Sequence, residues 1–75
     1  MDLDLVKAFN ETIEVYEVMA KDLAVAAKVG GNQISLFRHR KSRIRYDTLQ
    51  ALLNALPREA QIYFVFLLTK QASGE

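Results

Sequence analysis

The 75-residue chain has no cysteine and no tryptophan, and it has only one proline, three glycines and one histidine. Without cysteine it cannot form a disulfide, a thiolate zinc site or a cysteine nucleophile. A single histidine cannot build a multi-histidine metal site within one chain. The pair Gly30-Gly31 lacks the surrounding pattern of a phosphate-binding loop. We therefore expect no metal, no cofactor, no small-molecule ligand and no enzymatic activity.

Long apolar runs are also missing. The longest, residues 62–68, is far shorter than the roughly 20 residues that a membrane-spanning helix needs. The first residues include Asp2 and Asp4, where a secretory signal would carry positive charge. We therefore expect a cytoplasmic, nucleoid-associated protein with no membrane partner. A chain of this length makes one small domain, residues 1–75, with a modest core.

Charge is distributed unevenly, although the net charge is only +1. Residues 1–27 carry six acids and two lysines, whereas residues 28–46 carry six basic residues and no acid. A basic band on an otherwise acidic small protein suggests a polyanionic partner that binds on one side. The alternative interpretation is a solvated charged loop.

The scarcity of proline and glycine and the lack of alternating apolar patterns predict helix throughout the chain. Apolar residues recur at three- and four-residue spacing from Leu5 to Tyr16 and again from Leu49 to Leu56. We predict an all-α fold, a compact bundle of five short helices over about residues 3–18, 22–28, 32–39, 47–56 and 58–70. Residues 71–75 are expected to form a frayed tail.

The order of a short helix, a tight turn, a second short helix, a basic loop and a leucine-striped helix resembles the lambda-repressor-like helix-turn-helix family, also called Cro-like or XRE-like. The resemblance runs without gaps over residues 20–56, with the motif itself at about residues 20–41. The small Ala24 stands where two helices would cross closely. The other family positions that match are Leu23, Val29, Ile34, Ser35, Phe37, Thr48, Leu49 and Leu56. The resemblance implies a domain that binds double-stranded DNA.

Several positions depart from the family pattern. Ala20 replaces a glutamine that commonly contacts phosphate, and Gly30 replaces a serine or threonine helix cap. Lys28 and Arg40 stand where glycine is common, and the position of Lys28 often requires a positive φ. The alternative is that Gly30-Gly31 takes over the turn, shifted by two residues. Glutamate and proline are common in the family where this chain has Arg38 and Ile44.

Ile34 and Phe37 are expected to anchor the helix at 32–39, leaving its outer face free to enter a major groove. The residues expected to read bases are Asn32, Gln33, Ser35 and Leu36; amides can pair with adenine, and Leu36 can contact a thymine methyl. The residues expected to contact phosphates are Arg38, His39, Arg40, Lys41, Arg43 and Arg45. Alternatively, Asn32 and Gln33 simply start the helix.

The segment "IYFVFLL" is apolar on every face, so a helix here cannot be covered by so small a domain alone. We expect a homodimer through this helix, with the interface residues Tyr63, Phe64, Phe66 and Leu67, and with two reading helices about one DNA turn apart. The alternative is a central helix covered by its own chain. The overall expectation is a sequence-specific transcriptional regulator, most simply a repressor. A protein-interaction module, as in an antitoxin or an accessory factor, is the alternative function.

Overall fold

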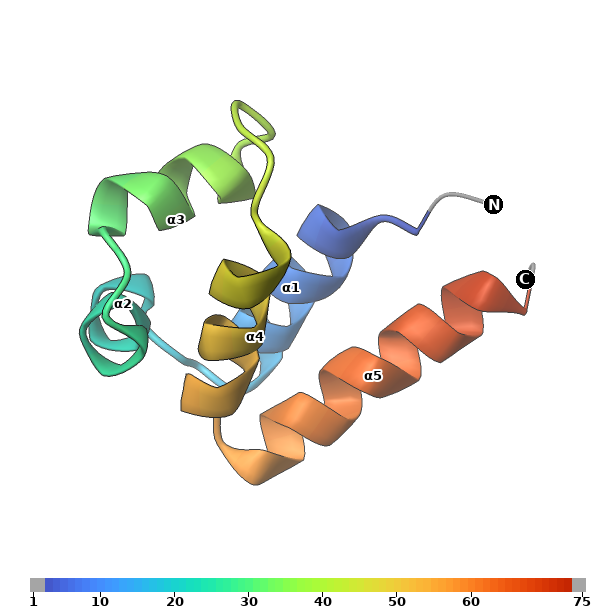
Figure 1. The fold of residues 1–75 in the computed structure, drawn as a ribbon. Coiled ribbons are helices and arrows are strands. Elements are labelled where there is room, and N and C mark those ends of the chain that lie inside the picture. The colour runs from blue at the N-terminus through green and yellow to red at the C-terminus, as the bar shows by residue number, and fades with distance from the viewer. Residues whose placement is uncertain (1–2, 74–75) are drawn as a thin grey trace.

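The computed structural model describes residues 3–73 and contains five α-helices and no strand in that range. The helices are α1 (Leu5–Val15), α2 (Ala20–Ala27), α3 (Gly31–Arg38), α4 (Tyr46–Ala55) and α5 (Arg58–Ala72). The predicted all-α class is therefore confirmed. Figure 1 shows α1 and α4 in the middle of the molecule, with α2 and α3 on one side and α5 on the other. No helix in this range is long and apolar enough to cross a membrane.

One core joins all five helices. Phe9 of α1 and Phe64 of α5 are almost fully buried, and Phe9 meets Phe37 of α3 edge to face, with ring centroids 5.6 Å apart. Leu23 of α2 and Leu52 of α4 complete the centre of this cluster. Such edge-to-face aromatic pairs contribute about 1 kcal/mol beyond the burial of their surface. α2 and α3 are thus fixed to α4 and α1 by apolar packing.

Three helices end in the same way, on a non-glycine residue with left-handed backbone geometry. These residues are Glu17 after α1, Lys28 after α2 and Arg40 after α3, with φ of 52°, 58° and 60°. After α2, the Lys28 amide donates to the Val25 carbonyl at 3.2 Å and the next amide donates to the Ala24 carbonyl at 3.0 Å. The same pair of bonds follows α1 and α3. This arrangement is the Schellman motif, which closes a helix by satisfying its last carbonyl groups.

Lys28 therefore supplies the left-handed residue of the turn between α2 and α3. Gly30 has an ordinary extended conformation, with φ of −63°, and serves as the cap residue of α3 without a side-chain hydrogen bond. The suggestion that Gly30-Gly31 would take over a shifted turn is wrong. The two glycines are also open to substitution, because a Cβ atom at either position would meet nothing within 4 Å.

The helix boundaries differ from the prediction for physical reasons. α1 is shorter than expected because Asp4 caps it, accepting the Lys7 amide at 3.0 Å, and because Glu17 ends it. α2 begins at Ala20, which places Asp22 in the first turn, where a negative charge favours the helix dipole. The prediction of a frayed tail over residues 71–75 is wrong for Gln71, which is helical and hydrogen-bonded to Asp4. Residues 74–75 lie outside the described residues.

Candidate nucleic-acid interface

The outer face of α3 is a polar surface on a firmly held helix. Ile34 and Phe37 keep only 1% and 4% of their surface exposed, so they attach α3 to the core. The exposed residues at the helical spacing of three and four are Asn32, Ser35, Leu36 and His39. Of the predicted base readers, Asn32, Ser35 and Leu36 share this face, while Gln33 is half-buried at its edge. Figure 1 shows α3 and the loop after it at the end of the molecule away from α5.

His39 lies at the end of α3 and folds back on the helix. Its Nδ1 is 2.9 Å from the Ser35 carbonyl oxygen, which can only accept a hydrogen bond. A hydrogen bond in this geometry requires Nδ1 to be the donor. The ring is held against the helix end and remains exposed, with Nε2 uninvolved in that bond.

Arg38 points toward α1 instead of toward solvent. Its Nε donates to Oδ1 of Asn10 at 2.8 Å, and Nδ2 of Asn10 donates to the Arg38 backbone carbonyl at 3.2 Å. Both bonds are partly buried. The Arg38 side chain therefore fixes the C-terminal end of α3 to α1.

Arg40 is also engaged with the N-terminal region. Its Nη2 lies 2.9 and 2.8 Å from the two carboxylate oxygens of Asp4. Hydrogen bonds from Arg40 and from the Lys7 amide hold the pKa of Asp4 below its usual range. The predicted phosphate residues Lys41 and Arg43 are exposed, and among residues 3–73 neither forms an ion pair. Arg45 is exposed and only loosely paired, with Nε 3.8 Å from Asp47.

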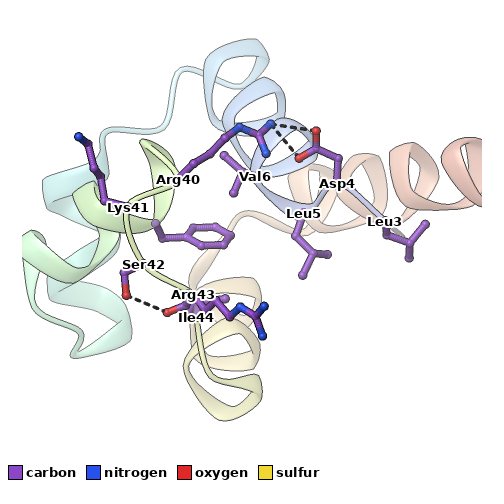
Figure 2. Close-up of a pocket in the computed structure, with 10 residues that line it drawn as sticks. Leu3, Asp4, Leu5, Val6, Arg40, Lys41, Ser42, Arg43 and Ile44 are labelled. Atoms are coloured by element: carbon purple, nitrogen blue, oxygen red, sulfur yellow. Dashed lines mark hydrogen bonds and ion pairs between the residues drawn. The ribbon is translucent and has the colours of Figure 1, made fainter. Parts of the chain in front are cut away.

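A groove of about 750 Å³ separates the loop after α3 from the start of α1. Leu5, Phe37 and Ile44 contribute apolar surface to it, and Arg40, Lys41 and Arg43 contribute positive charge. Figure 2 shows the Asp4–Arg40 pair at one end of this groove and Arg43 of the loop at the other. The groove thus carries positive charge from the loop after α3 toward the N-terminus of α1.

The sequence did not predict that Asn10 contacts Arg38 or that Asp4 contacts Arg40, because these partners lie 28 and 36 residues apart in the chain. No local pattern indicates such contacts, because they depend on how α1 crosses α3. Ile62 and Val65 were not among the predicted interface residues of α5, although their spacing from Phe66 places all three on one helix face.

The predicted dimer surface on α5 needs correction. Phe64 has no exposed surface and belongs to the chain's own core, so it cannot contact a second chain. Leu67 is half-buried against the same core. The outer face instead presents Ile62, Val65 and Phe66, which are 61%, 55% and 56% exposed. A central helix covered by its own chain is therefore wrong for α5.

Tyr63 lies at the edge of that face and connects α5 to α1. Its ring meets Tyr16 edge to face at 5.6 Å and Phe66 at 6.4 Å. Its hydroxyl donates to a carboxylate oxygen of Glu11 at 2.8 Å. This hydrogen bond to a carboxylate raises the pKa of Tyr63.

Within residues 3–73, no three His, Asp or Glu side chains come together as metal ligands would. Comparison of the chain with family models, with curated proteins and with solved structures finds no match.

Proposed function

We propose that this protein binds double-stranded DNA in a sequence-specific way through α3, as a helix-turn-helix regulator that acts most simply as a repressor. The observation that carries the proposal is the outer face of α3. Its exposed side chains stand on a helix that Ile34 and Phe37 fix to the core, and the exposed cations Lys41 and Arg43 follow directly in the next loop. A helix of this kind fits a major groove, and flanking cations bind phosphates.

The turn geometry supports the same proposal. Positions 28 and 40 are those where the lambda-repressor-like family commonly has glycine, and both have the left-handed backbone that favours glycine. α2 and α3 pack against each other around the first of these turns, with Ala24 buried near the crossing. The resemblance in sequence is thus accompanied by a compatible backbone.

We also propose that the protein binds DNA as a homodimer through the outer face of α5. Ile62, Val65 and Phe66 form an exposed apolar stripe of the kind that marks a protein interface. Glu59 and Lys70 are eleven residues, or about three turns, apart, so they lie on the same flank of this stripe. An antiparallel pairing of two α5 helices would bring Glu59 of one chain near Lys70 of the other.

The test is selection of randomised duplex DNA by the purified protein near physiological salt, with sequencing of the bound pool. Enrichment of an inverted repeat with half-sites about one helical turn, roughly 34 Å, apart supports a dimeric regulator. A pool without enrichment contradicts sequence-specific binding.

The second candidate function is a protein-interaction module of the antitoxin or accessory-factor kind. The observation that favours it is the same exposed stripe on α5, bordered by Glu11 and Glu59 and by the rings of Tyr16 and Tyr63. Only the DNA-binding function requires an affinity for duplex DNA that falls steeply with salt. Titration with duplex DNA at two salt concentrations therefore separates the two candidates.

A further inference from the structure

The Asp4 carboxylate is paired with Arg40, a basic residue of the candidate DNA surface. Of the six cations between residues 28 and 45, only Arg40 has its guanidinium in close contact with a carboxylate in the described part of the chain. Both oxygens of Asp4 contact the same nitrogen, Nη2, at 2.9 and 2.8 Å. The carboxylate thus stands where an anionic oxygen of a phosphate would bind Arg40.

The carboxylate is held in place from two sides. It caps α1 through the Lys7 amide, and the backbone of Asp4 is bonded to the Gln71 side chain of α5. In that second contact the Asp4 amide donates to Oε1 of Gln71, and Nε2 of Gln71 donates to the Asp4 carbonyl. The fold therefore sets the position of the carboxylate.

The backbone of Arg40 is also constrained, because its left-handed conformation closes the Schellman motif after α3. The pair nevertheless remains accessible to a polyanion, since the side chains of Arg40 and Asp4 are 59% and 37% exposed. Exposed ion pairs of this kind contribute little to the stability of a fold, because solvent screens them. A DNA phosphate can therefore displace the carboxylate at a small cost.

We propose that Asp4 competes with DNA phosphates for Arg40 and thereby lowers both the affinity of the protein for DNA and the salt dependence of binding. The proposal rests on the DNA-binding function proposed above. It assigns to Asp4 a role at the same surface, although Asp4 belongs to α1's cap and not to the helix-turn-helix region. Arg40 then differs from Lys41 and Arg43, which bind phosphates without first leaving a partner.

The experiment measures duplex DNA affinity over a range of salt for four proteins: wild type, Asp4→Asn, Arg40→Gln and the double variant. Asparagine remains a good helix cap, so Asp4→Asn is expected to fold normally, which thermal denaturation checks. We expect Asp4→Asn to bind several-fold more tightly at low salt, with a steeper salt slope; the upper limit of the increase is one phosphate contact, or roughly 0.9, which is reached when Arg40 stays paired with Asp4 in wild type. In the Arg40→Gln background the same change should give little gain.

The control for a general effect of charge is Asp22→Asn, which removes an exposed acid from α2. An equal gain from Asp4→Asn with and without Arg40, or an equal gain from Asp22→Asn, would overturn competition for Arg40. Weaker binding by Asp4→Asn would show that the pair positions Arg40 for DNA, which also overturns the proposal. If the wild type and Asp4→Asn both fail to bind duplex DNA, the proposed function fails together with this inference.

Discussion

Asn10 and Arg38 bind each other reciprocally, each through one donor and one acceptor. Arg38 Nε donates to the Asn10 side-chain oxygen at 2.8 Å, and the Asn10 amide donates to the Arg38 carbonyl at 3.2 Å. That carbonyl lies at the C-terminal end of α3, so Asn10 both satisfies a helix end and orients the arginine. The candidate reading helix is thereby fixed to α1 by polar contacts as well as by Ile34 and Phe37.

The first prediction concerns this pair. Asn10→Ala should lower the free energy of unfolding by about 1–2 kcal/mol, because it leaves the partly buried Arg38 groups without their partner. Chemical denaturation measures the change. Asn54→Ala is the matched control, since Asn54 is exposed on α4 and its change should be close to zero. Equal stability of the two variants would show that the Asn10–Arg38 contact does not hold α3.

The second prediction concerns the left-handed helix ends. A non-glycine residue in this conformation costs about 1–2 kcal/mol, part of which glycine avoids despite its greater entropy when unfolded. Lys28→Gly should therefore raise the free energy of unfolding by about 0.5–1 kcal/mol. Lys28→Ala is the control, because it removes the same charge and keeps the Cβ atom. A gain from alanine as large as that from glycine would mean that the lysine charge, and not the backbone, is the cause.

The core and the existence of helices α1 to α4 could be predicted from sequence because apolar spacing at three and four residues is a local property, and α5 could be predicted from Pro57 at its start. Ile34 and Phe37 were expected to point inward and do so. The inward face of α5 could not be predicted in the same way, because "IYFVFLL" is apolar all round and gives no preferred side. The tertiary packing of α5, chiefly against α1, buries Phe64 and leaves Phe66 exposed.

The basic loop shows the opposite limitation. Its charge is evident in the sequence, but the availability of each cation is not. Arg38 is engaged by Asn10 of α1, and Arg40 is engaged by Asp4 at the cap of α1. In the described part of the chain, Lys41 and Arg43 have no such ion pair. Charge counting therefore overstates the number of cations that are ready to bind phosphate.

The third prediction separates the two kinds of residue on α5. Phe66→Glu should abolish self-association with little loss of stability, because Phe66 is 56% exposed. Phe64→Ala should instead lower the free energy of unfolding by about 3–5 kcal/mol, as for other buried aromatic residues. Light scattering coupled to size exclusion measures the mass, with Val25→Glu on α2 as the control for an added surface charge. A wild-type monomer at tens of micromolar would contradict the dimer.

The fourth prediction concerns pH. The pKa of Asp4 is lowered in the folded protein, so this group adds stability at pH values above its unfolded pKa, and the contribution is lost as the pH falls through the folded pKa. Arg40→Gln removes the largest cause of the lowering, so the pKa of Asp4 should rise toward its ordinary value of 3.8. NMR titration of the carboxyl carbon measures the pKa of Asp4 in the wild type and in Arg40→Gln. An unchanged Asp4 pKa in Arg40→Gln would mean that the contact does not persist in solution.

The fifth prediction concerns the division of roles on the candidate DNA surface. Asn32 projects from the outer face of α3 near its start, where an amide can reach the edge of a base, whereas Arg43 lies in the loop beside the groove. Asn32→Ala, and likewise Gln33→Ala, should therefore reduce the preference for the selected sequence over random duplex by about 1–3 kcal/mol, with little change in the salt slope. Arg43→Ala should weaken binding to both duplexes alike and reduce the slope by about one phosphate contact.

The two duplexes are measured for each variant at several salt concentrations, and a normal thermal transition confirms that the fold is intact. Equal losses on both duplexes for all three variants would show that α3 contributes affinity without reading sequence.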